Sequence, residues 1–364
     1  MGYQPIKTQQ LTISQLTINN KEKLFKYNKL RSNTLLLIVS LLIVNLINPA
    51  FAQTTFDPMS IGVGARALGM GKAYVAVGEE GDTIFTNPAG LGEIDSFQFT
   101  SMSGKVLDDV TYTVLGGVYP FGERSAFGIG YAAASVSGIE IYNDLGEYQK
   151  KSTFGNSVLL ACYGRKITEK LSLGINLKYF VQDGGEIDAG DGSGMNLDIG
   201  LLQKGLGWLS WGVVGQNILS SGKMRYNSGE EAELPMIIKA GTRLHILGEE
   251  FEAAMVSPVK LVAVADADIS LRAAEPTTTH TGLELSLSPN LTLRAGMDQD
   301  PKPKGFQNNL TAGVSLRFAG LGFHYAYHPY GEILANATHY FSISFDERGW
   351  PFEGPPDIFL GSRD

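Results

Sequence analysis

The residues that could do chemistry in this chain of 364 residues are few, and their spacing does not suit a catalytic centre. The five histidines are His245, His280, His324, His328 and His339. In a strand, His324 and His328 would lie on one face but about 13 Å apart, too far to share a metal ion. No Gly-x-Ser-x-Gly segment offers a strained nucleophile. The sequence therefore predicts no metal centre, no cofactor and no enzyme.

Three further features resemble sites but lack the context that a site needs. Residues 62–67 fit the Gly-x-Gly-x-x-Ala expression of dinucleotide-binding loops, yet no strand precedes them and no βαβ unit follows. The acidic, glycine-rich loop 183–191 lacks the ordered ligand spacing of a calcium site, so a solvated loop is the more common outcome. Cys162, the single cysteine, lies in an apolar run, which favours burial over reactivity.

Composition and charge point towards strands and away from nucleic acid. Hydrophobic residues make up 43% of the chain, charged residues only 18%, and there are 44 glycines. Glycine-rich, charge-poor chains suit strands and turns better than helices. The formal net charge is −8, and removing residues 1–52 would take away six basic side chains and one acidic one. The remaining acidic chain has no electrostatic footprint for nucleic acid.

The N-terminus has the pattern of an export signal. Basic residues between Lys21 and Arg31 precede an apolar run from Leu35 to Ile47, which is too short for a membrane span. The sequence Ala-Phe-Ala at 50–52 fits the site that signal peptidase accepts. We therefore predict a signal peptide over residues 1–52, with an extended basic region, and cleavage between Ala52 and Gln53.

The rest of the chain alternates between apolar and polar residues. Segment 291–298 places Leu, Leu, Ala and Met on one face and Thr, Arg, Gly and Asp on the other. The same alternation fills residues 171–179, 195–201, 310–318 and 321–328. A period of two is typical of strands that present different residues to the two faces of a sheet.

Three observations favour a transmembrane barrel over a soluble sandwich. The segments have the 9–12 residues that a tilted membrane strand needs. Short and long connections alternate, as outer-membrane barrels require. The polar face carries charges in mid-strand, which a water-filled lumen would solvate: Lys178, Asp198, Lys239, Arg243, Glu284, Arg294 and Arg317.

The sequence predicts an all-β, antiparallel transmembrane barrel of about 14 strands with an N-terminal plug or hatch. We expect the hatch at 53–93, the barrel at 94–346 and a periplasmic tail at 347–364. Both termini would be periplasmic, and the long connection 247–258 makes the strands beside it the least certain pair. Aromatic residues at the short turns predict an interfacial girdle: Phe121, Trp208, Trp211, Phe318 and Phe345. The expected strands lie near 94–102, 109–119, 125–136, 152–164, 170–182, 194–204, 208–217, 234–246, 259–271, 279–288, 290–299, 308–318, 320–329 and 338–346.

Two short stretches resemble a known family. Residues 61–76 resemble the opening of the PorV/PorQ family, part of the FadL-like outer-membrane superfamily, and residues 87–91 resemble the hatch element of FadL. The family residues are Gly64, Arg66, Gly69, Met70 and Gly71 in the first stretch and Asn87, Pro88, Ala89, Gly90 and Leu91 in the second. This chain departs from the pattern at Lys72, where a glycine is common, and in its tail after the last strand.

The resemblance implies an integral outer-membrane barrel with one of two functions. A PorV-like protein would be a type IX secretion component that binds or shuttles exported cargo proteins. A FadL-like protein would be a passive transporter that admits hydrophobic small molecules and releases them through a gap in the wall. A barrel with neither activity is a third reading. The charged lumen argues against a greasy tunnel through the whole barrel, so a FadL-like path would need an apolar pocket beneath the extracellular loops. We favour secretion on resemblance alone.

Overall fold

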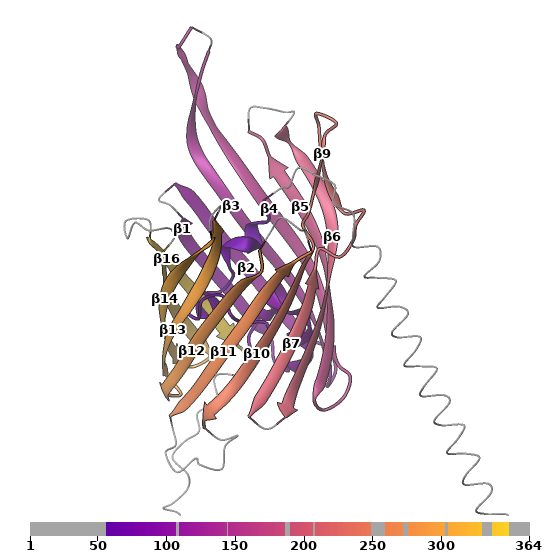
Figure 1. Ribbon diagram of the computed structural model, residues 1–364, viewed down its shortest axis with the longest axis vertical. Helices are drawn as coiled ribbons and strands as arrows, with labels where there is room; N and C mark the ends of the chain where they lie inside the picture. The colour runs from indigo at the N-terminus through magenta and orange to yellow at the C-terminus, as the bar shows by residue number, and fades with distance from the viewer. Residues whose placement is uncertain are drawn as a thin grey trace, which may run out of the picture. The chain divides into compact units, whose positions relative to one another are not determined.

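Fourteen antiparallel strands close into a barrel in the computed structural model, which describes residues 56–348 except 107–108, 144, 186–189, 207, 249–258, 272–275, 303–304 and 330–336 (Figure 1). The predicted signal peptide and nearly all of the predicted tail lie outside these residues. The first and last strands, β1 and β16, complete the ring, with Gln98 paired to Asp346 and Gly104 to Tyr340. None of the described helices is long and apolar enough to span a bilayer.

The predicted barrel is confirmed, with differences in strand ends. Its strands are β1 (Gln98–Val106), β2 (Val110–Pro120), β3 (Ser125–Tyr142), β4 (Tyr148–Lys166), β5 (Leu171–Asp183), β6 (Gly192–Leu206), β7 (Leu209–Gln216), β10 (Ile237–Leu247), β11 (Lys260–Ser270), β12 (Thr278–Ser288), β13 (Leu291–Lys302), β14 (Gly305–Phe318), β15 (Leu321–Pro329) and β16 (Ala337–Asp346). A short extra hairpin, β8 (Lys223–Tyr226) and β9 (Glu231–Glu233), follows β7 and pairs with the end of β6.

Two differences from the predicted strands have plain structural reasons. Strand β1 begins four residues later than predicted, because a 3₁₀ helix (Pro88–Glu93) occupies the chain before it. Strands β3 and β4 are 18 and 19 residues long, because their hairpin continues far beyond the rest of the barrel (Figure 1). The pair beside connection 247–258 is regular, since β10 and β11 pair from Ile237–Ser270 to Leu247–Leu261 with one irregularity.

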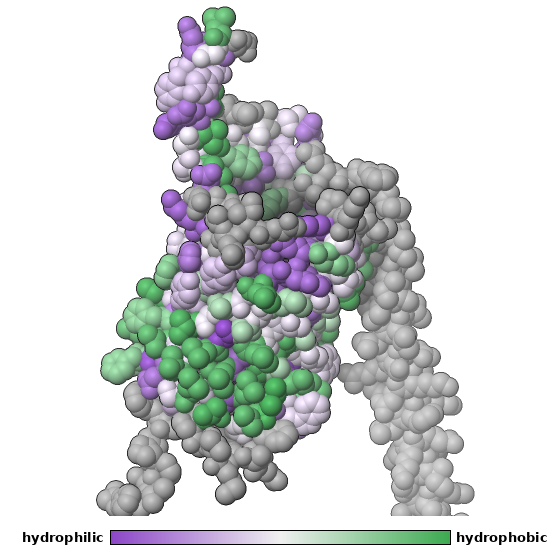
Figure 2. Space-filling view, turned by 60° about the vertical axis from the view of Figure 1, so that its left-hand side comes forward, coloured by the Kyte–Doolittle hydropathy of each residue, from purple (hydrophilic) through white to green (hydrophobic). Residues whose placement is uncertain are grey.

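The outer face of the barrel is apolar, as a lipid-facing surface must be. On β5, Leu173, Ile175, Leu177 and Tyr179 all point outward and are exposed, while the residues between them point inward. Figure 2 shows the resulting apolar band on the outside of the lower barrel. Around the short turns the exposed aromatic residues include three of the predicted girdle: Phe121, Trp208 and Phe318.

The described part of the N-terminal segment, residues 56–93, lies inside the barrel; we call it the hatch (Figure 1). It contains four single turns of helix: η1 (Pro58–Ile61), α2 (Ala65–Leu68), α3 (Thr83–Thr86) and η2 (Pro88–Glu93). Nearly all of its side chains are buried. Because the hatch has so little regular secondary structure, its backbone groups depend on the wall for hydrogen-bond partners.

Glycines in the wall let the backbone of the hatch touch the strands. Gly164, Gly174 and Gly200 pair with one another across β4, β5 and β6, and a Cβ at Gly174 would overlap the carbonyl of Pro88. Gly282 and Gly296 pair across β12 and β13, and a Cβ on either would overlap the backbone of Met70. We call these two sets the glycine slots. They explain why glycine, which weakens an ordinary strand, is frequent here.

Replacing slot glycines by alanine should therefore loosen the hatch. We expect Gly174→Ala and Gly296→Ala each to lower the free energy of unfolding by about 1–3 kcal/mol, the usual cost of overpacking. Thermal unfolding in detergent and proteolysis of the hatch would measure the effect. The matched control is Gly117→Ala, since Gly117 lies on β2 with nothing within 4 Å of an added Cβ. Equal loss of stability in all three variants would contradict the role of the slots.

Candidate functional site

The interior of the barrel has two different halves. Inward residues of β10–β15 are largely charged or polar, whereas those of β1–β5 are largely apolar above the hatch. The alternation of each strand fixes which residues point inward, but the sequence does not show that the polar and apolar strands are grouped on opposite sides.

An ion-pair cluster joins the hatch to the polar half. Arg66 of α2 is 5% exposed, and its guanidinium lies 2.5 Å from Glu284 of β12, 2.9 Å from Glu80 and 3.1 Å from Glu79. Glu284 also pairs with Arg294 at 2.6 Å. Two more wall arginines complete the Arg66 cluster by pairing with the hatch: Arg243 with Glu79 and Arg317 with Glu80. Burial acts to raise the pKa of Glu80, but Arg66 and Arg317 outweigh it and lower that pKa.

A second cluster centres on a fully buried carboxylate, Asp298 of β13. It lies 2.8 Å from the ammonium of Lys72, 2.7 Å from His280 Nδ1 and 2.9 Å from His328 Nε2. Lys72 has φ 68°, a left-handed conformation that favours glycine. Lys72 therefore combines an ion pair to Asp298 with a backbone conformation that favours glycine, the residue common at this position in the family that the stretch resembles. Among the described residues, no group of three His, Cys, Asp or Glu side chains is arranged to hold a metal ion.

All seven charged residues expected in the lumen point inward, but most are buried and paired rather than in water. Lys178 lies 2.7 Å from Asp198, and Lys239 lies 2.6 Å from Asp268. The other four belong to the Arg66 cluster: Arg243, Glu284, Arg294 and Arg317. The expectation that water surrounds these charges does not hold at this level, because carboxylates of the neighbouring strands and of the hatch pair with the cations instead.

The family residues of the hatch form buried bends against the wall. The Asn87 amide donates to the carbonyls of Val75 (2.8 Å) and Leu201 (3.1 Å), and its oxygen accepts from Ala89 N (3.1 Å). Pro88 begins η2, and Gly90 and Leu91 are buried in it. In the first stretch, Gly69 approaches Gly313 of β14, Met70 fits against Gly282, and Gly64 and Gly71 have positive φ. Sequence reasoning missed the hatch carboxylates, although adjacent glutamates in a small, apolar segment were a visible signal.

The apolar half lies above the hatch on β1–β5. Laterally paired, inward residues form what we call the apolar row: Met102, Val114, Ala132, Val158 and Phe180. All five are at most 2% exposed. They share one hydrophobic cluster with Met59 and Ile61 of η1 and with Met224 of β8. The row packs with the β8–β9 hairpin, so an apolar interior lies beneath the long loops, as a path for hydrophobic molecules would require.

A row of hydroxyl and amide side chains lies one level nearer the loops. The inward residues at this level pair laterally from β16 through β1–β6 to β8. Five of them have polar side chains, and we call these five the hydroxyl row: Tyr340, Tyr112, Asn156, Gln182 and Tyr226. The Tyr112 and Tyr340 rings meet edge to face at 6.4 Å. The Tyr226 hydroxyl donates to Gln182 (3.4 Å). The apolar row is therefore bounded by neutral polar groups on its loop side.

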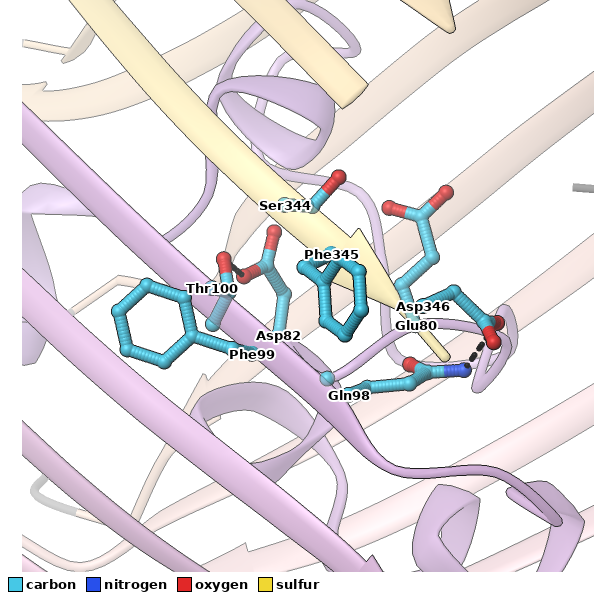
Figure 3. Close-up of a pocket in the computed structure, with 9 residues that line it drawn as sticks. Glu80, Asp82, Gln98, Phe99, Thr100, Ser344, Phe345 and Asp346 are labelled. Atoms are coloured by element: carbon cyan, nitrogen blue, oxygen red, sulfur yellow. Dashed lines mark hydrogen bonds between the residues drawn. The ribbon is translucent and has the colours of Figure 1, made fainter. Parts of the chain in front are cut away.

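A cavity of about 10 Å³, enough for about one water, lies where the hatch meets β1 and β16 (Figure 3). Its walls include Glu80, Asp82, Gln98 and Thr100, and Figure 3 shows Asp82 directed at Thr100. Thr100 donates to Asp82 at 2.5 Å. Burial raises the pKa of Asp82 to about 6, although this hydrogen bond opposes the rise. The cavity is too small and too acidic for a hydrophobic molecule.

Comparison with solved structures finds similar barrels. The Pseudomonas putida toluene transporter TodX matches with a TM-score of 0.54 and 14% identity, over 78% of this chain and 98% of that one. The CymD monoaromatic hydrocarbon channel matches with a TM-score of 0.53 and 14% identity, over 80% and 98%. A Pseudomonas aeruginosa FadL homologue matches with a TM-score of 0.50 and 13% identity, over 78% and 98%.

The barrel has the FadL-like fold. A closed barrel with an apolar outer face is what a membrane-spanning β-barrel requires, and none of these three structures is named as an enzyme. No protein-family model and no curated protein sequence matches the chain. The secretion family that the N-terminal stretch resembles therefore finds no support in these comparisons.

The Arg66 cluster should hold the hatch closed. We expect Arg66→Met to cost about 3–5 kcal/mol, because it leaves three carboxylates short of a buried partner. In planar bilayers this variant should show ion-conducting openings that the unaltered protein lacks. The matched control is Arg124→Met, which removes a pair with Glu169 that is exposed on both sides and is worth less than about 1 kcal/mol. A variant at Arg66 that conducts no more than the control would refute this role.

Proposed function

We propose that this protein is a passive channel for small hydrophobic molecules across the outer membrane. The observation that supports it most is the apolar row, a continuous apolar inner face on β1–β5 that lies beneath the loops of a FadL-like barrel. Burying apolar surface is favourable by about 25 cal/mol per Å² removed from water, so a hydrophobic molecule would bind favourably at such a face. The FadL-like reading is thereby favoured over the secretion reading, which rested on sequence resemblance alone.

The β8–β9 hairpin, residues 223–233, covers the apolar row from the loop side, and we call it the flap. Its inward residues Met224 and Ala232 are 1% exposed and pack in the same hydrophobic cluster. It is held to β6 by two paired positions, Gly192–Tyr226 and Ser193–Arg225, whereas β5 and β6 share twelve. Because so few backbone contacts hold it, we infer that the flap moves to admit the solute.

The wall above β7 is the natural place for that movement. Strand β7 pairs with β6 only up to Ile199–Gly215, and Asn217 then turns with φ 54°. The Asn217 amide donates to the carbonyl of Pro235 at 3.0 Å, which anchors the base of the flap beside β10. By contrast, β3 pairs with β2 without interruption from Val110–Val136 to Pro120–Ala126. We infer that entry or lateral release occurs between β6 and β10 rather than beside β3.

Tethering the flap with a disulfide tests both the channel and the movement of the flap. Ser193 and Arg225 are Cα partners, so Ser193→Cys with Arg225→Cys should form a disulfide that holds β8 against β6. We expect oxidised cells to take up radiolabelled α-methylstyrene several-fold more slowly, with recovery after reduction. The control pair is Gln299→Cys with Asn308→Cys on β13 and β14. Uptake that equals that of cells without the protein would contradict the channel; uptake that ignores the tether would contradict the flap.

A second candidate function is a PorV-like role in type IX secretion. It rests on the resemblance of residues 61–76 and on the projecting β3–β4 hairpin, whose exposed apolar residues include Tyr142, Leu145 and Tyr148. Exposed apolar groups on a projecting element suit contact with another protein better than solute passage.

Deletion of the gene separates the two candidates. If the channel proposal holds, we expect an unchanged set of secreted proteins and impaired growth on hydrophobic substrates. Comparative proteomics of the culture medium, with the gene restored as a control, makes the measurement. Loss of particular surface proteins with normal uptake would favour secretion over the channel.

A further inference from the structure

The Tyr112 hydroxyl is a buried polar group that has no hydrogen-bond partner among the described residues. Tyr112 is fully buried on the inner face of β2, and its hydroxyl makes no hydrogen bond to any described residue. Thr338, on the same inner face of β16 and two residues from Tyr340, is 1% exposed, and its hydroxyl also makes none within the described chain. A buried hydroxyl left unsatisfied is costly, so such groups usually meet a ligand or water.

The surroundings of Tyr112 show what kind of group would satisfy it. Its paired neighbours are Gly104 on β1 and Ala134 on β3, which offer no side-chain donor or acceptor. Gly104 leaves room for the Tyr340 ring, because a Cβ there would lie 2.5 Å from that ring. The Tyr340 ring therefore lies against the wall and packs edge to face with Tyr112. The Tyr112 hydroxyl is left at the upper border of the apolar row.

The charge around this border excludes an ionic ligand. The described residues of the apolar row and the hydroxyl row carry no charged side chain. Two cations lie near this border, and each is already paired: Lys178, one level nearer the hatch, lies 2.7 Å from Asp198, and Lys72, whose charge acts on Tyr340, lies 2.8 Å from Asp298. The charged group that acts on Tyr112 is a carboxylate, Asp57. An anion at Tyr112 would therefore lose its hydration without gaining a free counter-charge, which is unfavourable in a buried site.

We propose that Tyr112 makes the interior a binding site for small neutral amphipathic molecules, with an apolar body on the apolar row and a hydrogen-bond acceptor on the Tyr112 hydroxyl. This inference rests on the proposed channel and deepens it, since it names the class of solute. Molecules with a carbonyl or ether oxygen would be preferred over hydrocarbons of equal shape. The preference arises because only the former satisfy a donor that is already buried in the empty protein.

Two probes of matched shape test the proposal: acetophenone and α-methylstyrene, which differ in C=O against C=CH₂. Equilibrium dialysis of the full-length mature protein in nanodiscs, corrected with empty nanodiscs, would give both Kd values. We expect Tyr112→Phe to raise the Kd of acetophenone about three- to tenfold and to leave that of α-methylstyrene unchanged. The matched control, Tyr119→Phe, changes an outward tyrosine of the same strand and should alter neither.

The outcomes separate this inference from the channel itself. Equal binding of acetophenone by the protein and by Tyr112→Phe overturns the role of Tyr112, even if cells take up both probes. Selective binding without uptake in cells supports the site and contradicts the channel. Absence of binding and of uptake for both probes contradicts both. Should Tyr112→Phe fail to fold, measured by its thermal unfolding, the unaltered protein provides the second measurement: a Kd for acetophenone no lower than that for α-methylstyrene overturns the proposal.

Discussion

The close contact between the hatch backbone and the barrel wall is the constraint on which the rest of the structure depends. Where the wall has no Cβ, at Gly174, Gly282 and Gly296, the hatch backbone comes within contact distance of the strands. Where the wall has a side chain, it is one that bonds the hatch: Asp266 accepts from the backbone of Tyr74 and Val75 at 2.6 and 2.8 Å. The hatch has little regular structure of its own, so these contacts take the place of secondary structure.

This constraint divides the interior between two tasks. The polar half, through the Arg66 cluster, pairs the buried charges of the hatch with opposite charges of the wall, because an unpaired charge is costly in a low-dielectric interior. The apolar row carries no charged side chain and is covered by η1 and the flap, so in the proposed function a hydrophobic solute reaches it when the flap moves. The Asp298 cluster likewise pairs a hatch charge with a wall charge: Lys72 forms a buried ion pair with Asp298 while its backbone has a positive φ. A charged lumen and a hydrophobic path are therefore compatible within one barrel.

The sequence predicted the wall well and the interior poorly, for physical reasons. Alternation along 171–179 or 291–298 follows from the pleat of a single strand, so the strand count and the inward direction of Lys178 and Arg294 could be read locally. Which inward residues lie at the same level depends on the register between neighbouring strands, so the grouping of Val114, Val158 and Phe180 was not visible in the sequence. The partners of Arg66 were missed, because Glu79 and Glu80 lie in a segment without any periodic pattern.

The family resemblance was informative about the fold and less so about function. Residues 87–91 and 61–71 do form the bends that lock the hatch, but these bends serve a plug in either function. The structure adds the asymmetry of the interior, which no short motif encodes. That asymmetry supports the proposed passage of small hydrophobic molecules more than a role in secretion.

Photoaffinity labelling would test the central claim most directly. A small apolar diazirine, added to the protein in nanodiscs and mapped by mass spectrometry, should label inward residues of β1–β5 such as Val114, Val158 and Phe180. Excess α-methylstyrene should suppress this labelling but not labelling of the lipid-facing residues. Labelling confined to the outer face, or equally strong on the polar half around Glu284 and Arg294, would contradict a hydrophobic path through the apolar half.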